Sequence, residues 1–82
     1  MSSKAYVLIE TEMGMTVSVA NELREKSGVA VSDVVTGPHD IVAVVHGSDN
    51  ETIAKIVLNE IQAIKGVQDT TTYMVVDNVS NK

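Results

Sequence analysis

The hydrophobic positions of this chain switch between strand spacing and helix spacing. Four segments are short, rich in β-branched residues and bounded by glycine or polar turns, which predicts strands. These strands are expected at residues 4–11, 29–35, 40–46 and 67–77. Two other segments, 16–27 and 48–66, repeat their apolar positions at helical spacing. The chain is therefore predicted to run strand, helix, strand, strand, helix, strand.

The ends of the two helices carry recognisable signals. Thr16 is the expected N-cap of the first helix, and Gly28 is expected to end it in a left-handed conformation. Ser48 and Glu51 fit a capping box at the start of the second helix, and Gly66 is expected to end it. The inward apolar stripes are predicted to be Val19, Ala20 and Leu23 in the first helix and Ile53, Ile56, Val57, Ile61 and Ile64 in the second.

This element order predicts an α+β fold of the ferredoxin-like βαββαβ type, a four-stranded antiparallel sheet with two helices on one face. The two halves echo each other at the entry to a strand, in Lys26-Ser27-Gly28-Val29 and Ile64-Lys65-Gly66-Val67. No linker or low-complexity segment divides the chain. We therefore expect a single domain over residues 1–82, with a flexible tail at 78–82.

Both faces of the predicted sheet are apolar. An antiparallel sheet with one face in water normally alternates apolar and polar residues. Here Tyr6 and Leu8 lie on the side away from Val7, and Val42 and Val44 repeat the pattern in the third strand. Two helices can cover only one face, and soluble monomers seldom expose a large apolar patch. A twofold dimer that packs sheet against sheet, of the dimeric α+β barrel type, is therefore expected.

Composition narrows the classes of function. The chain has 82 residues, no cysteine, and a net charge of −5. Its basic residues are scattered, whereas phosphate backbones are bound by clustered ones, so direct nucleic-acid binding is not expected. No apolar run is long enough to span a membrane, and the N-terminus is too short for a signal peptide. A cytoplasmic protein that does not bind membranes is therefore expected.

The two histidines give little support for metal or nucleophilic chemistry. His39 and His46 show no HxH, HxxxH or HExxH spacing, and no serine motif accompanies them. We therefore expect no metal site, no cofactor and no catalytic residue. His39 lies in a predicted turn, where it either contacts a ligand or is simply exposed.

The turn between the second and third strands is the strongest candidate site. Gly37 followed by Pro38 fixes a turn with exposed backbone amides, which can bind a carboxylate, and Asp40 can pair with an ammonium group. Together they suit an amino-acid zwitterion. Asp40 could equally serve only to cap the turn. Thr70 and Thr72 share one face of the last strand and could present hydroxyls to one ligand.

Three short motifs follow one another in a distinctive order and spacing. They are Val35-Thr36-Gly37-Pro38-His39-Asp40, Ile64-Lys65-Gly66-Val67 and Thr70-Thr71-Thr72-Tyr73-Met74-Val75-Val76. With the apolar strand and capped helix between the first two, this arrangement resembles the effector-binding domain, or RAM domain, of the Lrp/AsnC transcriptional regulators. The resemblance extends from Ala5 to Asp77.

The resemblance implies a non-enzymatic, ferredoxin-like domain that dimerises through its sheet and assembles further into rings, commonly octamers. It implies an amino-acid effector bound between dimers near the glycine turn, and mixed assembly with full-length Lrp/AsnC regulators. Only three residues precede the first strand, so a stand-alone RAM domain without the helix-turn-helix domain is expected. By position, the ligand-binding residues would be Val34, Thr36, Gly37, His39 and Asp40 in the turn and Thr70, Thr72 and Tyr73 in the last strand.

Two other functions stay open at this point. The family turn carries Tyr or Phe where His39 stands, which allows a purely structural oligomer that has lost its ligand. A small dimeric α+β barrel enzyme, such as an isomerase or monooxygenase, would use His39 or His46 as a general base. An ACT-like amino-acid module shares the topology, but the region near Gly14 lacks the supporting turn pattern.

Overall fold

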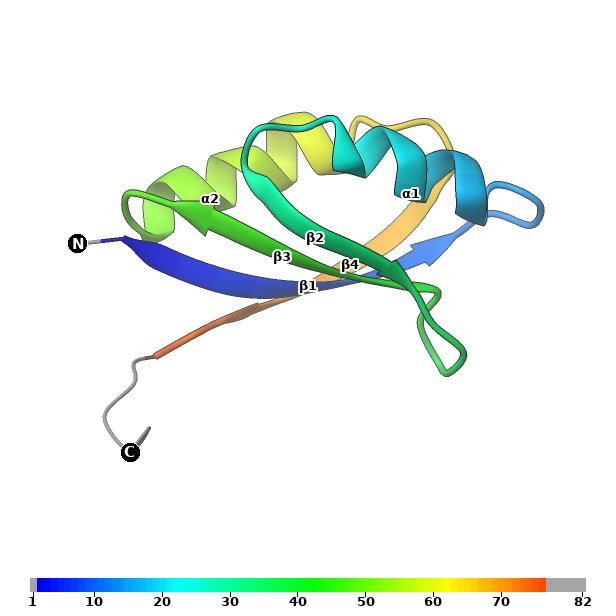
Figure 1. Cartoon of the computed structure of the whole chain (residues 1–82), viewed down its shortest axis with the longest axis horizontal. Coiled ribbons are helices and arrows are strands. Elements are labelled where there is room, and N and C mark those ends of the chain that lie inside the picture. The colour runs from blue at the N-terminus through cyan, green and yellow to red at the C-terminus, as the bar shows by residue number, and fades with distance from the viewer. Residues whose placement is uncertain (1, 77–82) are drawn as a thin grey trace.

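The computed structural model of the protein describes residues 2–76. Its elements follow in the order β1 (Ser3–Thr11), α1 (Thr16–Arg24), β2 (Val29–Val34), β3 (Ile41–Gly47), α2 (Asn50–Ile56), a π-helical continuation η1 (Val57–Ile61) and β4 (Val67–Met74) (Figure 1). The predicted βαββαβ order is confirmed. Residue 77, where the last strand was predicted to end, and the predicted tail 78–82 lie outside the described residues.

The four strands form one antiparallel sheet in the order β2-β3-β1-β4. At its centre, Val7 of β1 lies opposite Ala43 of β3 on one side and Thr72 of β4 on the other. Figure 1 shows α1, α2 and η1 together on one face of this sheet. The predicted two-layer α+β fold is therefore confirmed.

The hydrophobic core fills the space between the sheet and the helices. Each predicted helix stripe is buried there, with the exception of Ile56, which packs only partly against the core. Complete burial of one Val, Leu or Ile side chain in this core stabilises the fold by roughly 1.5–3 kcal/mol relative to leaving it exposed. The core residues are Ala5, Val7, Ile9, Val19, Ala20, Leu23, Ile41, Ala43, Val45, Ile53, Val57, Ile61 and Ile64.

The predicted signals at the ends of α1 are wrong. Thr16 is the first helical residue rather than the N-cap, and its hydroxyl bonds to that of Thr11 at 2.7 Å. The helix ends at Arg24, and Gly28 has no positive φ. A Cβ at Gly28 would stand 2.7 Å from Cδ1 of Ile56, so the glycine makes room for α2 instead of reversing the chain.

The N-cap of α2 is Asp49, one residue after the predicted Ser48. The Asp49 carboxylate accepts a hydrogen bond of 2.7 Å from the backbone N–H of Thr52. Hydrogen bonding from the side chain of Thr52, and then from its backbone N–H, lowers the pKa of Asp49. The helix ends at Ile61, before Gly66, although Gly66 does adopt a left-handed φ of +103°. A Cβ there would lie 2.8 Å from that of Met15, so both the conformation and the space at Gly66 require glycine.

Arg24 covers part of the free edge of strand β2. Its guanidinium donates from Nε and Nη2 to the carbonyl of Ser32 at 3.2 and 2.9 Å. The Ser32 hydroxyl in turn donates to the carbonyl of Ala20 at 3.3 Å. Unpaired carbonyls on an edge strand invite pairing with another chain, so Arg24 both ties α1 to β2 and protects this edge.

The second face of the sheet, which we call the outer face, lies away from both helices. Strand alternation and register assign to it Val31 and Asp33 of β2, Val42, Val44 and His46 of β3, Lys4, Tyr6, Leu8 and Glu10 of β1, and Asp69, Thr71 and Tyr73 of β4. Its centre is apolar and partly solvent-accessible: Tyr6 is 41% and Tyr73 57% exposed. The predicted second apolar face is therefore present.

Candidate functional site

The turn at residues 35–40 projects beyond the sheet where β2 passes into β3 (Figure 1). Its base is closed by a hydrogen bond from the Val35 N–H to the Asp40 carbonyl at 2.9 Å, and the Asp40 N–H donates to the carbonyl of Ile9 at 2.9 Å. Thr36 and Gly37 are exposed, and His39 is half-buried. The predicted turn is thus anchored to β1 and leaves its tip accessible.

The carboxylate of Asp40 is already engaged within the protomer. Its Oδ2 accepts hydrogen bonds from the Thr11 N–H at 2.9 Å and from the Thr11 hydroxyl at 3.2 Å. Because a hydroxyl has a single proton to donate, the 2.7 Å contact between Thr11 and Thr16 must run from Thr16 to Thr11. This chain of donors fastens the turn to β1 and to the start of α1, and within residues 2–76 it leaves Oδ1 of Asp40 as the oxygen available for a ligand.

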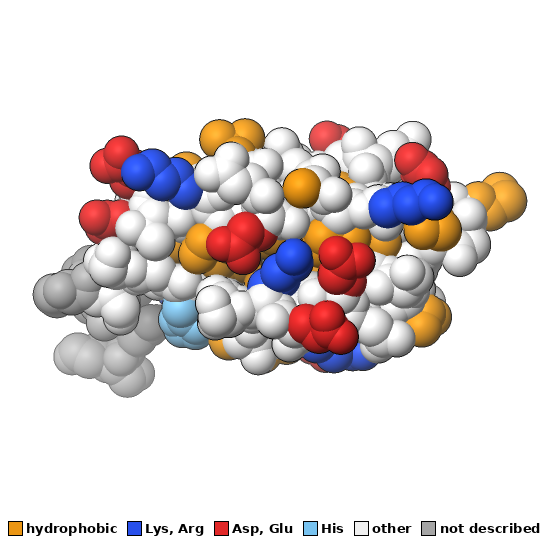
Figure 2. Space-filling model, turned by 90° about the horizontal axis from the view of Figure 1, so that it is seen from above, with side chains coloured by type: hydrophobic (Ala, Val, Ile, Leu, Met, Phe, Trp, Pro, Cys, Tyr) orange, Lys and Arg blue, Asp and Glu red, His pale blue; other side chains and the backbone are white. Residues whose placement is uncertain are grey.

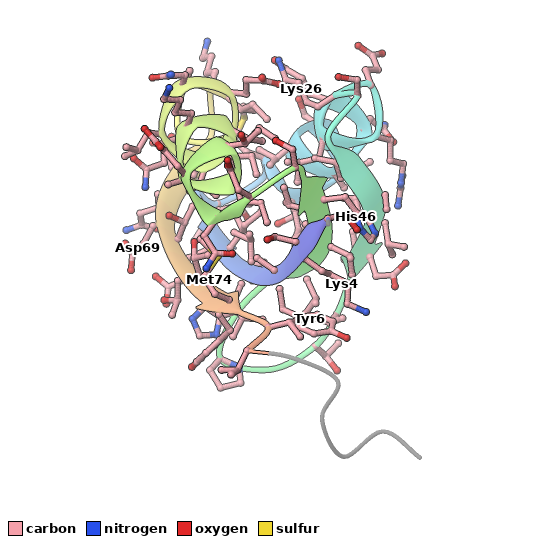
Figure 3. The ribbon with its side chains drawn as sticks, turned by 90° about the vertical axis from the view of Figure 1, so that its left-hand side faces the viewer. Lys4, Tyr6, Lys26, His46, Asp69 and Met74 are labelled. Carbon is pink, nitrogen blue, oxygen red and sulfur yellow. The ribbon has the colours of Figure 1, made fainter. Side chains whose placement is uncertain are left out.

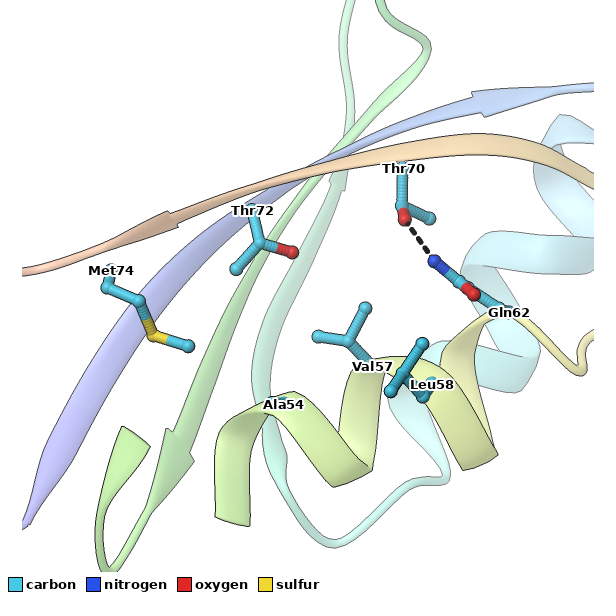
Figure 4. Close-up of a pocket in the computed structure, with 7 residues that line it drawn as sticks. All are labelled: Ala54, Val57, Leu58, Gln62, Thr70, Thr72 and Met74. Atoms are coloured by element: carbon cyan, nitrogen blue, oxygen red, sulfur yellow. Dashed lines mark hydrogen bonds between the residues drawn. The ribbon is translucent and has the colours of Figure 1, made fainter. Parts of the chain in front are cut away.

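Thr70 and Thr72 line a groove on the helix side of β4 (Figure 4). The groove has a volume of about 260 Å³. Figure 4 shows both threonines extending from the strand towards the helix, and the Gln62 amide donates from Nε2 to the Thr70 hydroxyl at 2.8 Å. The other lining residues are Ala54, Val57, Leu58 and Met74. A mainly apolar wall with two hydroxyls and one amide, and no charged side chain, surrounds this space.

The groove wall contributed by the helix was missed at the sequence level. Ala54, Leu58 and Gln62 follow one another at four-residue spacing, one position after the buried stripe of Ile53, Val57 and Ile61. Residues at this spacing share a helix face, so the pattern does signal a second stripe beside the core. Only the structure shows that it faces β4.

The eight predicted ligand residues therefore occupy three places in one protomer. The turn holds Thr36, Gly37, His39 and Asp40, and Val34 ends strand β2 beside it. The groove holds Thr70 and Thr72, and Tyr73 lies on the outer face opposite Tyr6. Thr70 is aligned with Ile9, which is aligned with Ile41, so strand β1 lies between the groove strand β4 and the end of β3 at the turn. Turn and groove are not adjacent within a single protomer.

Neither histidine lies in a cluster of chemically active groups. His46 is exposed at the end of β3, opposite Lys4, and His39 lies in the turn. Within residues 2–76, no three His, Cys, Asp or Glu side chains are grouped so that they could hold a metal ion. The groove lining contains no titratable side chain, so the described residues place no general base there.

The helix-covered side of the molecule carries acidic and basic side chains interspersed with neutral ones (Figure 2). Two of its ion pairs join residues one helical turn apart, Lys26 with Glu22 and Lys55 with Glu51. Among the described residues, no helix is long and apolar enough to cross a membrane.

Comparison with known proteins gives one family and a consistent fold. The sequence model of the Lrp/AsnC ligand binding domain matches residues 4–82. The crystal structure of TTHA0845 from Thermus thermophilus is 31% identical, superposes with a TM-score of 0.87, and covers 92% of this chain and 94% of that one. No curated protein sequence matches the chain.

Two transcriptional regulators share the fold at lower identity. E. coli AsnC is 22% identical with a TM-score of 0.87, over 94% of this chain and 52% of AsnC. The regulator NMB0573 from Neisseria meningitidis, solved as a complex with L-Met, is 19% identical with a TM-score of 0.82, over 94% of this chain and 51% of that one. The chain thus spans about half the length of these regulators.

Proposed function

Because this chain belongs to the family of the Lrp/AsnC ligand binding domain, we propose that it is an amino-acid effector-binding and oligomerisation module without enzymatic activity. The family is one of regulatory ligand-binding domains. The L-Met bound to the Neisseria meningitidis regulator supports an amino acid as the ligand class. In this role the protein would act in the cytoplasm and influence transcription indirectly, through assembly with other regulators.

The groove beside β4 is the proposed place for the side chain of the amino acid, and its geometry is the observation that carries the proposal. Its volume of about 260 Å³ lies below the roughly 300 Å³ at which pockets for drug-sized ligands begin, which suits a smaller molecule. Leu58 and Met74 supply an apolar wall, and Thr72 offers a hydroxyl. An apolar amino acid such as methionine or leucine fits this lining best.

The charged groups of the amino acid need partners that the groove does not contain. Burying an unpaired ammonium or carboxylate is costly, so a second region must bind them. In the proposed site, the backbone amides at Gly37 bind the carboxylate and Oδ1 of Asp40 binds the ammonium. Since turn and groove are separated within one protomer, the site is proposed to be completed where the turn of one protomer meets the groove of another.

The same reasoning supports a ring of dimers. Pairing through the apolar outer face would give the dimer, and contacts between turn and groove would join dimers into an octamer or a similar ring. An amino acid bound at such a contact favours the assembly in which the contact exists, because a ligand shifts only an equilibrium for which its affinity differs. Mixed assembly with a full-length Lrp/AsnC regulator would transmit this change to transcription.

Calorimetry with each of the twenty amino acids tests the ligand proposal directly. Asp40→Asn removes the charge but keeps an oxygen for Thr11, and it should weaken binding by about tenfold or more. Thr72→Val removes the groove hydroxyl at nearly constant volume and should weaken binding about fivefold. The matched control is Thr71→Val, on the opposite face of the same strand, which should leave groove binding unchanged.

A structural oligomer without a ligand is the second candidate function. The engagement of Asp40 by Thr11 favours it, because the carboxylate already has a role in holding the turn. This candidate predicts an oligomer whose mass, measured by light scattering, does not change when amino acids are added. Absence of binding by all twenty amino acids would contradict the effector proposal and leave this candidate standing.

A further inference from the structure

Strand β4 forms one free edge of the sheet, because it is the last strand in the order β2-β3-β1-β4. At one end of this strand, the Val75 N–H donates to the carbonyl of Lys4 at 2.9 Å. Opposite residues of an antiparallel pair alternate between those that exchange backbone hydrogen bonds and those that do not. The backbone N–H and C=O groups of Thr70, Thr72 and Met74 therefore point away from β1, towards the free edge.

The edge of β4 lacks the protection that Arg24 gives to the other edge of the sheet. On β2, the guanidinium of Arg24 covers the outward carbonyl of Ser32. Within residues 2–76, no comparable side chain bonds to the outward backbone groups of β4, since Gln62 reaches only the hydroxyl of Thr70. Unpaired backbone groups on an edge strand can pair with another extended chain. Strand addition is therefore open at β4 and obstructed at β2.

Two hollows follow one another between β4 and the helix. The mainly apolar groove described above includes Thr72 and Met74. A second hollow, also of about 260 Å³, shares Gln62 and Thr70 with that groove and continues to Asp69. Figure 3 shows Met74 and Asp69 on β4, along one side of the molecule. The three steps from Thr72 to Asp69 span about 10 Å, so the two hollows together suit an extended chain.

Asp69 lies opposite Glu10 of β1, and like charges in this position destabilise a sheet. The ion pairs found among the described residues are those on the helices, so the two carboxylates have no cationic partner within that part of the protomer. Because Asp69 belongs to the edge strand, a residue of an added strand can lie directly opposite it with its side chain on the same face. A lysine or arginine in that position would pair with Asp69 and reduce its repulsion with Glu10.

We propose that the free edge of β4 binds an extended segment of a partner protein, antiparallel to β4, in which an apolar residue is followed three positions later by lysine or arginine. The apolar residue lies opposite Thr72 and its side chain enters the groove. The basic residue lies opposite Asp69 on the other face, because side chains alternate along a strand. Main-chain hydrogen bonds with Thr70 and Thr72 supply affinity, as in other strand additions. The net charge of −5 favours a basic partner.

This inference goes beyond the proposed amino-acid site, although the two share the groove. An amino acid and the partner segment would exclude each other, but neither needs the other in order to bind. A peptide with blocked ends has no terminal ammonium or carboxylate group, so it tests strand addition by itself. Failure of all twenty amino acids to bind would leave the peptide result standing, and failure of the peptide would leave the amino-acid proposal standing.

The probe is the blocked peptide acetyl-Thr-Ser-Leu-Thr-Ser-Lys-Thr-Ser-amide, titrated into the full chain by calorimetry. Its leucine would lie opposite Thr72 and its lysine opposite Asp69. N-methylation of the leucine removes the N–H that donates to the Thr72 carbonyl, and it should weaken binding about tenfold or more. N-methylation of the next residue is the matched control, because that N–H points away from β4, and it should have little effect. Equal losses at the two positions would overturn strand addition.

Charge reversal tests the basic position. Asp69→Lys should weaken binding of the lysine peptide roughly tenfold, and a peptide with glutamate in place of the lysine should bind this variant better than it binds the wild type. The control is Glu22→Lys, which makes the same change in net charge on α1 and should change neither peptide's affinity. Affinities that ignore the charge at Asp69, or no binding of the lysine peptide at about 1 mM, would overturn the inference.

The chain itself carries the proposed spacing once near its end, in Val79 and Lys82. Light scattering of the wild type and of Lys82→Glu, with and without the peptide, separates a partner protein from a second copy. Self-association that Lys82→Glu abolishes and the peptide prevents would assign the edge to residues 79–82 of a second copy and overturn the partner. Peptide binding with no effect of Lys82→Glu on mass would support the partner.

Discussion

The two faces of the sheet have similar hydrophobic content and different surroundings. In β1, Val7 and Ile9 point towards the helices and have no exposed surface, whereas Tyr6, between Ala5 and Val7 on the same strand, is 41% exposed. Burial of the helix-covered face stabilises the protomer as a single chain folds. The outer face can gain comparable free energy only by covering its apolar centre with another surface, so that gain depends on protein concentration.

This difference separates fold stability from assembly within a single strand. A residue on the helix-covered face should change the free energy of unfolding of the protomer. Its neighbour on the outer face should mainly change association. The predictions that follow test this separation, beginning with the largest expected effect.

Ile9→Ala should lower the free energy of unfolding by about 2–5 kcal/mol, because it leaves a cavity in a fully buried site. Leu8→Ala, one residue away on the outer face, should cost much less in the protomer and should instead weaken self-association. Urea unfolding at several protein concentrations measures both effects. Equal losses in the two variants at concentrations that leave the chain monomeric would break the distinction between the faces.

Gly66→Ala should destabilise the helix-covered side by about 1–3 kcal/mol, because φ is +103° and the new Cβ would meet Met15. Gly37 provides the matched comparison, since a Cβ there would meet no atom within 4 Å and its φ is not positive. Gly37→Ala should leave thermal unfolding nearly unchanged. A similar loss of thermal stability in both variants would contradict the conformational role assigned to Gly66.

Asp40→Ala tests the end of the sheet where the turn is fastened to β1. It should cost about 1–2 kcal/mol, because the buried Thr11 loses its acceptor. Asp40→Asn should recover most of this stability while still lacking the charge proposed for ligand binding. Chemical denaturation of both variants checks the structural role separately from calorimetry, and equal destabilisation by the two would show that the charge itself holds the turn.

The smallest effect is expected at Asp49, the N-cap of α2, which lies on neither face of the sheet. The effect concerns the pH dependence of stability. Hydrogen bonding of Asp49 with Thr52 lowers the pKa of the folded state below the ordinary value of 3.8. The cap therefore contributes its full stabilisation above pH 3.8 and loses it as the pH falls through the lowered pKa. Asn also caps helices, so Asp49→Asn should remove this part of the acid dependence without removing the cap. Denaturation curves between about pH 2 and pH 5 would reveal the change, and identical pH profiles of wild type and variant would contradict it.

Periodicity was sufficient to predict the architecture because the core follows it closely. The stripe of Val19, Ala20 and Leu23 is completely buried, and so is Ile53 in the second helix. Signals at single residues were less reliable where tertiary contacts compete with local preference. Gly28 looked like a helix terminator, but it accommodates Ile56, and Asp49 rather than Ser48 caps α2.

The site was harder to predict than the fold because its parts are distant in sequence. Asp40 and Thr11 are 29 residues apart, and no local pattern links the turn to the hydroxyl that holds it. Side chains alternate between the two faces of a strand, so Tyr73 lies on the face opposite to Thr70 and Thr72. The prediction from the motif placed all three residues in one site and did not take this alternation into account. In the proposed site, turn and groove come together only when a second chain is present, and a single sequence does not describe that contact.

The π-helical segment η1 has a consequence for how the groove could change in evolution. The Gln62 N–H bonds to the carbonyl of Val57, five residues back, so this turn holds one residue more than an α-helical turn. Loss of one codon between Val57 and Ile61 would restore α-helical bonding and, because the π-turn already accommodates the extra residue, would leave the residues after it on the same faces. Gln62 would then still face Thr70, and Ile61 would stay in the core. A one-residue deletion would thus reshape the groove wall at Leu58 alone, a change that amino-acid binding by a deletion variant can measure, while the sheet and its core stayed as they are.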